Sequence, residues 1–494
     1  MERGLTEGSK DVQFESEAQR ALDTAVARGA DYADVRFGAV RDEHVEVRNG
    51  VVADVHDSES AGFSVRVLRD GAWGFASSAV MSDAEIDRVA AQAVDIAKAS
   101  ARVKGNGITL APAGRFVDSY RTPREIDPAT VSLEERIKHL LAVEAEVRAA
   151  KGVTVGKAWI DVWRTQKTFA STEGSMIEQE VLQCGSGLHA LAVGEGDVQD
   201  RVFPGTCGLY QTGGYEIVRK AALLENARRI GEEAVALLTA PQCPSGRKDI
   251  VLSGDQVSLQ IHESIGHALE LDRVMGWEAN FSGTSFATLD KLGTFRYGSG
   301  IVSVVCDMTC PLALATQGYD DEGTPAKSVD LIRDGILVGY MAGRDTAHVA
   351  NVDVGGCVRS EYWGRLPMIR IGNVNLEPGR ASDDELMADI KDGVYMQSNR
   401  SWSIDDKRLN FQFGCQIGYE IKDGKKGRLL KNPTYAGMTP AFWGACDAIG
   451  DESTWVAWGT PNCGKGEPLQ TARSCQGSSP ARFRGIDVGV GYGA

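Results

Sequence analysis

The 494-residue sequence lacks three features that would each point to a particular class of protein. It has no uninterrupted apolar run long enough to span a bilayer, which argues against a transmembrane protein. Residues 1–19 are polar and charged, without the apolar core of a signal peptide. No basic block offsets the net charge of −15, which argues against a nucleic-acid partner held through its phosphates. We therefore expect a soluble, cytoplasmic protein with neither a membrane nor nucleic acid as partner.

Cysteine is present but is not arranged as a disulfide framework. The ten cysteines are spread through a long chain, and without an export signal we expect all of them to be free thiols. Cys306 and Cys310 form a single C-x3-C pair, which we interpret as two buried small residues. A hydrophobic content of 43% is ordinary for a globular protein, and the length allows two or three domains with proper cores.

The first half of the chain has the pattern of an α+β domain, which we place at residues 1–240. Asn49-Gly50 and Asp70-Gly71 lie between alternating segments and predict two β-hairpins. Helices capped by residues such as Ser82 would lie against an antiparallel sheet. We predict helices at 17–28, 83–101, 132–150 and 215–238, and strands at 32–38, 44–48, 51–55, 62–68, 72–76, 153–163 and 168–182.

A turn-rich break at 241–246 separates this domain from a second one, at residues 247–494. The second domain has many short strand patterns and few helical ones, which predicts a large antiparallel or barrel-like sheet. We predict a short helix at 383–391 and strands at 248–252, 301–305, 336–341, 367–371, 410–421 and 483–488.

The most informative stretch is His262-Glu-Ser-Ile-Gly-His267, in a chain with only seven histidines. Apolar residues recur around it at spacings of four and three, which predicts a helix with one buried face. Ser253 followed by Gln256 predicts a capping box at the start of this helix. The recurring apolar residues are Val257, Ile261, Ile265 and Ala268.

The spacing of the two histidines requires a distorted helix. His262 and His267 are five positions apart, so a regular helix of about 3.6 residues per turn would point them roughly 140° away from each other. The common His-Glu-x-x-His arrangement has a spacing of four. Gly266, directly before His267, is where the helix could unwind or bulge to bring both rings to one ion.

Two histidines and a carboxylate are the side chains that a hydrolytic zinc site requires, although a core helix with two unrelated histidines is the simpler alternative. Neutral imidazoles bind the ion, and Glu263 could take a proton from a bound water. A third ligand must come from elsewhere, and Cys463 stands out because it lies in a glycine-rich turn where Lys465 would favour the thiolate. By local chemistry alone, Cys446, Cys475 and His348 remain alternatives.

Several segments resemble the TldD/PmbA family of zinc metallopeptidases, also called modulators of DNA gyrase. The stretch from His262 to His267 is similar to the family's H-E-x-x-x-H site, and Cys463-Gly-Lys to its C-terminal C-G-K. The similar segments keep the family's order over almost the whole length, which makes the set specific. The others are Gly29-Ala-Asp-Tyr-Ala-Asp-Val, Trp73-Gly-Phe-Ala-Ser and Asp320-Asp-Glu-Gly-Thr-Pro325.

The resemblance implies a two-domain subunit that pairs with a second subunit around an enclosed chamber. One zinc ion per active subunit would be held by His262, His267 and Cys463, with Glu263 as the general base. The PmbA/TldE-type sister lacks the zinc motif, so this chain resembles the active half. Its partner would be a second copy or a PmbA/TldE-type subunit, and its substrates unfolded or short peptides, including precursors of peptide natural products.

Two other functions stay open at this point. A non-catalytic modulator that binds gyrase or another partner would not need an intact His-Glu-His set. A structural zinc site would need a fourth protein ligand.

Two further sets of residues have no assigned role. One set is the acidic triplet Asp320, Asp321 and Glu322, which could line the substrate path or bind a second cation. Its composition favours a solvated turn instead. The family resemblance favours a structural loop near the site. His348 is left as a candidate donor near the chamber.

Overall fold

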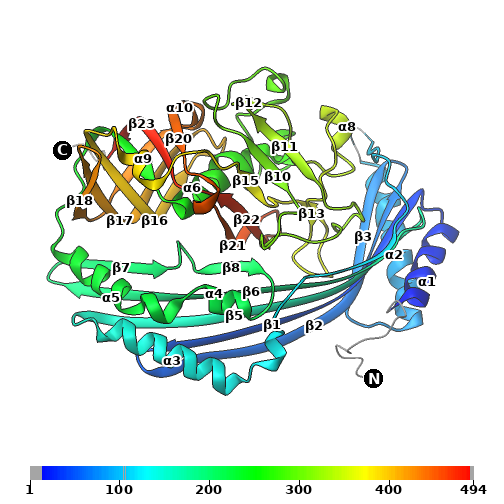
Figure 1. The fold of residues 1–494 in the computed structure, drawn as a ribbon. Helices are drawn as coiled ribbons and strands as arrows, with labels where there is room; N and C mark the ends of the chain where they lie inside the picture. Colours follow the sequence, from blue (N-terminus) through cyan, green and yellow to red (C-terminus); the bar gives the residue numbers. More distant parts are fainter. Residues whose placement is uncertain (1–13, 104, 106, 490–494) are drawn as a thin grey trace.

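A long curved sheet carries helices on one face and a β-rich half of the chain on the other (Figure 1). The computed structural model describes residues 14–103, 105 and 107–489. Most of residues 1–19, for which the sequence predicts no signal peptide, therefore lies outside the described residues. Within these ranges, no helix is both long and apolar enough to cross a membrane. The α+β prediction is confirmed.

The N-terminal half is built on an eight-stranded sheet in the order β3-β2-β1-β5-β6-β4, with β7 and β8 also paired to β6. Neighbouring strands are antiparallel except β4, which runs parallel to β6. The strands are β1 (Tyr32–Arg48), β2 (Val51–Arg69), β3 (Ala72–Ser78), β4 (Val117–Arg121), β5 (Val153–Ser171), β6 (Met176–Gly194), β7 (Asp197–Phe203) and β8 (Leu209–Thr212).

The central strands are longer than the sequence pattern indicates. The strands predicted at 32–38 and 44–48 are one continuous strand, β1, which pairs throughout with β2 and β5. The polar run at 41–43 interrupts the apolar alternation, but pairing with β2 and β5 on both sides keeps the backbone extended. The prediction at 168–182 was also wrong, because the turn between β5 and β6 falls at 172–175.

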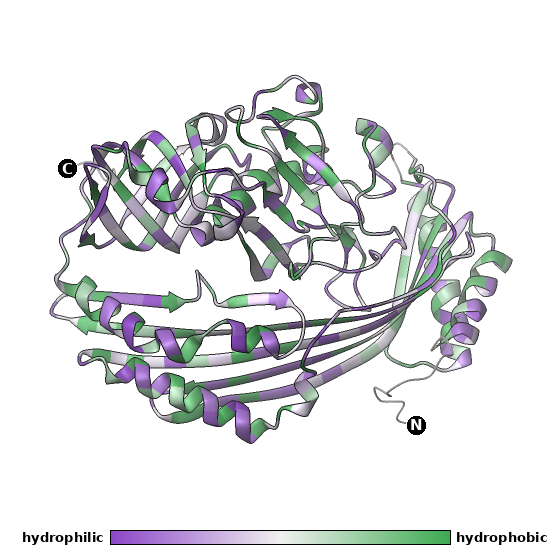
Figure 2. Ribbon diagram, in the orientation of Figure 1, coloured by the Kyte–Doolittle hydropathy of each residue, from purple (hydrophilic) through white to green (hydrophobic). Residues whose placement is uncertain are grey.

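Helices cover one face of this sheet because that face of β1 is apolar. Val35, Phe37, Val45 and Val47 all have odd numbers, so they share one face of the strand, and they belong to the cores under the helices. In Figure 2 these helices show hydrophobic and hydrophilic stripes, as expected of surface helices. They are α1 (Glu15–Ala27), α2 (Asp83–Ala101), α3 (Leu133–Ala149), α4 (Glu216–Lys220) and α5 (Leu223–Thr239).

The helix predicted at 215–238 is divided into α4 and α5. Ala222 lies between them with a left-handed backbone conformation (φ 48°), which ends the first helix before the second begins.

The C-terminal half contains a closed barrel, as the sequence predicts. The ring runs β16-β9-β23-β19-β17 and returns to β16, and only the β9–β16 pair is parallel. β18 also pairs with β17, and β20 pairs with β23. These strands are β9 (Gly246–Leu252), β16 (Asp392–Ile404), β17 (Asn410–Lys422), β18 (Lys425–Leu430), β19 (Thr434–Met438), β20 (Cys446–Ile449) and β23 (Ala481–Val488).

Smaller sheets and short helices connect the barrel to the long sheet. The strands predicted at 301–305, 336–341 and 367–371 are shorter or shifted, and the helix predicted at 383–391 ends at Met387. The helices are α6 (Gly254–Ile261), α7 (Leu271–Val274), α8 (Ala347–Ala350), α9 (Asp383–Met387) and α10 (Thr439–Gly444). The strands are β10 (Val304–Asp307), β11 (Ser328–Arg333), β12 (Ile336–Leu337), β13 (Val358–Arg359), β14 (Met368–Ile369), β15 (Val374–Leu376), β21 (Val456–Lys465) and β22 (Gln470–Ser478).

A pair of glycines lets the two halves approach closely. Gly38 of β1 and Gly62 of β2 are opposite each other in the sheet. A Cβ at Gly62 would lie 2.6 Å from the Trp363 ring, and one at Gly38 would lie 3.1 Å from the Trp363 Cβ. The glycines therefore leave the space that Trp363 occupies, and its Nε1 donates to Ser60 Oγ at 3.1 Å.

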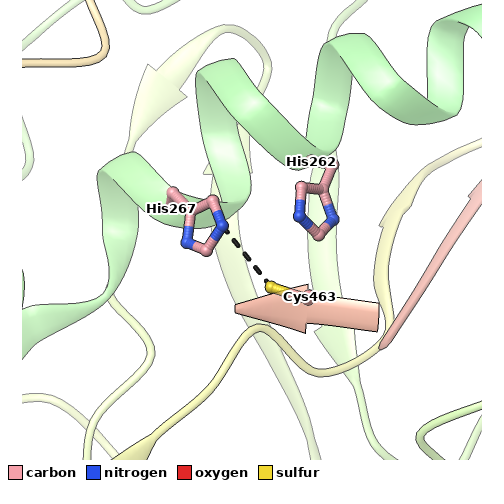
Figure 3. A group of neighbouring side chains, drawn as sticks. All are labelled: His262, His267 and Cys463. Atoms are coloured by element: carbon pink, nitrogen blue, oxygen red, sulfur yellow. Dashed lines mark hydrogen bonds between the residues drawn. The ribbon is translucent and has the colours of Figure 1, made fainter. Parts of the chain in front are cut away.

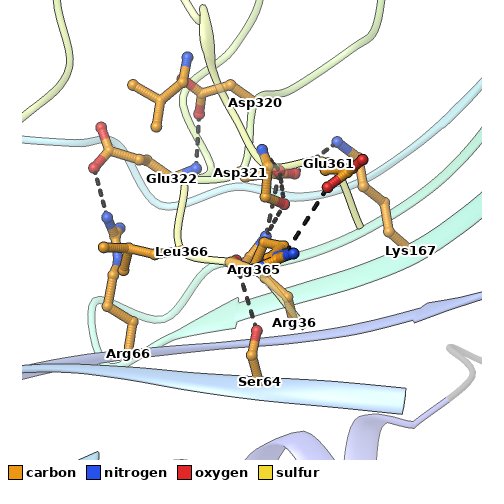
Figure 4. Close-up of polar contacts among 12 residues, drawn as sticks. Arg36, Ser64, Arg66, Lys167, Asp320, Asp321, Glu322, Glu361, Arg365 and Leu366 are labelled. Carbon is orange, nitrogen blue, oxygen red and sulfur yellow. Dashed lines mark hydrogen bonds and ion pairs between the residues drawn. The ribbon is translucent and has the colours of Figure 1, made fainter. Parts of the chain in front are cut away.

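Buried ion pairs join the two halves at Asp321 (Figure 4). Asp321 accepts from Lys167 Nζ at 2.9 Å and lies 3.3 Å from Arg36 Nη1. Burial would raise the pKa of Asp321, but the charges of Lys167 and Arg36 outweigh burial and hold it well below its usual range. The prediction of a solvated turn was wrong, because Asp320, Asp321 and Glu322 are all buried.

The two neighbouring acids, Glu322 and Asp320, also accept hydrogen bonds from the protein. Glu322 accepts from Arg66 Nη1 at 3.0 Å, which adds a second ion pair between the halves. Asp320 accepts backbone N–H groups of Glu322, Thr324 and Val358. Burial and the nearby Glu322 charge raise the pKa of Asp320 to about 7. The triplet is therefore a structural junction between the halves.

Asp321→Asn should lower the free energy of unfolding by about 3–5 kcal/mol, because it leaves buried cations without their carboxylate. This stabilisation is present above the ordinary carboxyl pKa of about 4 and is lost as the pH falls through the lower folded-state pKa. Urea unfolding at pH 7 measures the change. The matched control is Asp57→Asn, which removes an exposed pair with Arg41 and should cost about 0–1 kcal/mol. Equal losses in the two variants would contradict the assignment.

Candidate metal centre

A local widening of the helix solves the spacing problem of the two histidines. α6 ends at Ile261, and residues His262–Gly266 form a single π-helical turn in which the His267 N–H donates to the His262 carbonyl five residues earlier. Such a turn holds more residues than an α-helical one, so side chains five apart come to the same side. The predicted distortion is confirmed. At Gly266 a Cβ would lie 2.9 Å from Ile371, so only glycine fits there without movement.

Contacts to the surrounding core fix this turn. Trp443 Nε1 donates to Ser264 Oγ at 2.9 Å, and the Tyr297 hydroxyl donates to the Ser264 carbonyl. The predicted capping box at the start of α6 was wrong. Ser253 does occupy the N-cap position, but its hydroxyl donates to Asp255, and the Gln256 amide donates to the barrel residue Tyr435.

The third predicted ligand, Cys463, lies beside both histidines (Figure 3). The candidate ligand atoms of His262, His267 and Cys463 all lie within 4.8 Å of one another, and all three residues are buried. Cys463 Sγ is 3.5 Å from His267 Nε2. Cys463 lies in strand β21 rather than in the expected turn, at a register shift in the pairing with β22. The strand irregularity aims its side chain at the helix.

The alternative third ligands lie elsewhere. Cys446 and Cys475 are buried thiols whose pKa is raised by burial, and neither belongs to this group. His348 is exposed on α8. All ten cysteines lie in the described part of the chain and are unpaired, as expected from the sequence.

Charges within this group shift the pKa of Cys463 and of His262. Burial alone would raise the pKa of Cys463, but the charges of His267 and His262 outweigh burial and hold it well below its ordinary value. Burial also disfavours the charged form of His262, yet the thiolate of Cys463 and the carboxylate of Glu263 raise its pKa to about 9. The site therefore stabilises a thiolate.

A buried carboxylate orients one of the imidazoles. His267 Nδ1 lies 2.8 Å from Glu270 Oε2, so its Nε2 is the nitrogen that faces Cys463. A hydrogen bond of this kind fixes the tautomer and ring orientation of a metal-binding histidine. Glu270 is not among the site residues predicted from the sequence, although its position three residues after His267 on a helical segment places it on the same face.

Lys465 places its positive charge beside the carboxylates of Glu270 and Asp272 and not beside the Cys463 thiolate. Its Nζ donates to both oxygens of Asp272 at 2.8 Å and to the Ile369 carbonyl, and lies 3.3 Å from Glu270 Oε1. Its charge is thus engaged by two acids. The histidines, rather than Lys465, favour the Cys463 thiolate.

Glu263 forms an ion pair that the sequence does not reveal. Its Oε2 accepts from Arg408 Nη1, which comes from the loop between β16 and β17. Arg408 has a left-handed backbone (φ 61°), and its carbonyl accepts from Thr439 Oγ1 at 2.7 Å. Burial would raise the pKa of Glu263, but the charges of His262, His267 and Arg408 lower it. Glu263 is therefore held as a carboxylate.

The donor set fits a zinc ion. Two imidazole nitrogens and one thiolate are ligands that zinc prefers, and three protein ligands leave a fourth position for solvent or substrate. The buried Nδ1 of His262 has no hydrogen-bond partner among the described residues, which is consistent with a site that is completed by another group.

Comparison with known proteins identifies the family. Models of three PmbA/TldA metallopeptidase domains match the chain: domain 1 at residues 33–97, the central domain at 126–240 and the C-terminal domain at 245–489.

Individual relatives cover most of the chain. It is 30% identical to a metalloprotease from Methanocaldococcus jannaschii, over 82% of this chain and 87% of that protein. It is 26% identical to a zinc metalloprotease TldD homologue from Saccharolobus solfataricus, over 85% and 89%. The fold matches TldE from Thermococcus kodakarensis with a TM-score of 0.72, at 15% identity and over 96% and 100% of the two chains. The chain therefore belongs to the PmbA/TldD metallopeptidase family and is a metallopeptidase.

Proposed function

We propose that this metallopeptidase is zinc-dependent and hydrolyses unfolded or short peptides inside a chamber formed with a second subunit. The observation that carries the proposal is the convergence of His262, His267 and Cys463, with Glu263 on the same turn. The zinc metalloprotease name of the Saccharolobus solfataricus relative supports zinc as the metal.

Each side chain of the site has a defined task in this reaction. Zinc held by the three ligands would supply Lewis acidity for attack on a peptide carbonyl. Glu263 accepts the proton of the attacking water and passes it to the leaving amine. Arg408 orients the Glu263 carboxylate and keeps it ionised. Glu270 holds the His267 ring with one nitrogen free for the metal.

Restricted access would select the substrates. His262, Glu263, His267 and Cys463 are each at most 7% exposed. A folded protein cannot present a peptide bond to such a site, whereas an extended segment can enter a narrow channel.

The likeness to TldE supports a paired assembly, with either a TldE-type subunit or a second copy of this chain as the partner. Mass measurement in solution on the chain alone distinguishes a second copy of this chain from a TldE-type partner.

The division into domains at residues 1–240 and 247–494 stays a prediction.

The two alternative functions are less well supported. A structural zinc site would have four protein ligands, and the described residues supply three. A non-catalytic modulator would have no need for a buried carboxylate ion-paired beside the ligands. Bound metal, measured together with hydrolysis of an unstructured peptide with and without a chelator, separates all three functions.

Glu263→Gln should retain zinc and lower kcat/KM by about 10²–10⁴-fold, which is the usual contribution of a general base. Hydrolysis of a quenched-fluorescence unstructured peptide and zinc content by elemental analysis measure the two effects. Unchanged hydrolysis would remove Glu263 from the mechanism.

Glu270→Gln should have the complementary effect and weaken zinc binding by about 10–100-fold, because His267 loses the partner that orients it. Competition with a chromophoric chelator measures the affinity, and a melting curve controls for misfolding. A folded variant with parental affinity would show that this hydrogen bond does not support the metal.

Cys463→Ser should abolish stoichiometric zinc binding, because an alcohol is a far weaker zinc ligand than a thiolate. Cys475→Ser is the matched control, since Cys475 is equally buried on the neighbouring strand β22 but lies outside the ligand group. Zinc-to-protein ratios after gel filtration compare the variants. Equal ratios would rule out Cys463 as a ligand.

A further inference from the structure

A cavity of about 370 Å³ lies between the long sheet and the C-terminal half. Its floor is formed by β1 and β5, and its roof by the segment around Arg359–Trp363 together with the β21–β22 hairpin. Its volume lies within the range of small-ligand sites. No member of the proposed metal site lines it.

Two of the arginines that line this cavity form no ion pair with an acid. Arg359 and Arg473 line it, and Arg370 lies behind the hairpin; none of them forms an ion pair in the described part of the chain. Arg359 donates only to the carbonyls of Arg473 and Ile371. Arg473 stacks on Trp163, with its guanidinium carbon 4.2 Å from the ring centroid. Burial lowers the pKa of both Arg359 and Arg473 to about 10.

Unused hydrogen-bond donors accompany these charges. The Nε atoms of Arg359 and Arg473 are buried without a partner, and so is the amide nitrogen of Gln317, which also lines the cavity. Gln317 is only 7% exposed, and its oxygen is already bound to Lys167. Buried donors without partners cost free energy unless a ligand or water satisfies them.

The acids that line the cavity do not neutralise these arginines by contact. Asp321 is engaged by Arg36 and Lys167, and Glu361 lies 3.9 Å from Arg365. Asp42 forms no ion pair with Arg473 in the described part of the chain, although its charge is the largest influence that opposes the lowering of the Arg473 pKa. The cavity thus retains positive charge with no salt-bridge partner.

The cavity is directly behind the strand that carries the proposed metal ligand. Ala472 lines the cavity and is the residue opposite Cys463 in the hairpin. Arg370 Nη2 donates to the Cys463 carbonyl, and the Cys463 thiolate contributes to the electrostatic environment of Arg359. The cavity and the proposed metal site are therefore adjacent through the β21–β22 hairpin.

We propose that this cavity binds the C-terminal carboxylate of the peptide substrate, held by Arg473 and Arg359 with the Gln317 amide as a further donor. The inference rests on the proposed peptidase function, for which it names a substrate feature. A guanidinium presents paired N–H groups that match the two oxygens of a carboxylate. The Trp163 ring holds the Arg473 guanidinium in a fixed plane, and this reduces the entropy lost on binding.

Binding of small peptides to the full-length chain tests the proposal without relying on turnover. The probes are acetyl-Ala-Ala with a free carboxylate, its C-terminal amide, and acetyl-Glu-Ala amide, which carries its carboxylate on a side chain. Calorimetry is performed on zinc-loaded Glu263→Gln protein, so that the probes survive, with their integrity checked by mass spectrometry. The free acid should bind at least about tenfold more tightly than either amide.

Arg473→Gln in the same background should bring the free acid to the affinity of the amides, with zinc content and melting temperature unchanged. Arg88→Gln, which removes an arginine on α2 far from the cavity lining, should preserve the preference. Equal binding of acid and amide, or a preference that survives Arg473→Gln, would overturn the proposal. Tight binding of the glutamate probe would overturn the assignment to the C-terminus. Failure of the parent chain to hydrolyse peptides, both alone and together with a TldE-type subunit, would overturn the proposed zinc-dependent hydrolysis instead. The binding result would remain interpretable in that case, because it does not depend on turnover.

Discussion

One hydrogen bond, from the His267 N–H to the His262 carbonyl, is the constraint on which the site depends. Without this five-residue step, a regular helix would turn the two imidazoles to different sides. The surrounding core accommodates the wider turn through Gly266 and through the bonds of Trp443 and Tyr297 to Ser264. A distortion that costs local regularity is thus maintained by tertiary packing.

The distribution of charge follows from burial. The thiolate, the imidazoles and Glu263 lie in a poorly hydrated interior, where each charge requires a partner. Arg408 and Lys465 provide positive charge around the acids of the site, and Arg36 and Lys167 do the same at the junction of the two halves. Arg359 and Arg473, at the cavity between the long sheet and the C-terminal half, are the exception, since neither forms an ion pair with a described carboxylate.

Local pattern predicted the elements that have a strong signal, such as the hairpin turns at Asn49-Gly50 and Asp70-Gly71 and the helix α2 after Ser82. Local pattern failed where pairing with distant strands determines the backbone conformation, as in the polar middle of β1. The candidate ligand set could be named because the segments around His262 and Cys463 resemble those of a known family, whereas local chemistry alone left the third ligand open. Arg408 and Glu270 could not be assigned roles, because an arginine 145 residues from its partner carries no local signal. The burial of Asp320–Glu322 depends on contacts with a distant sheet.

The separation of the ligands along the chain has a consequence for biosynthesis. Cys463 follows His267 by 196 residues, a length that a ribosome translates in about 10–40 s at about 5–20 residues per second. Throughout that interval the emerging polypeptide carries both histidines but no thiolate to complete the set. With the proposed ligand set, the hydrolytic centre would be silent until the last strands of the barrel are being made, so a nascent or truncated chain that lacks Cys463 would not hydrolyse its unfolded neighbours.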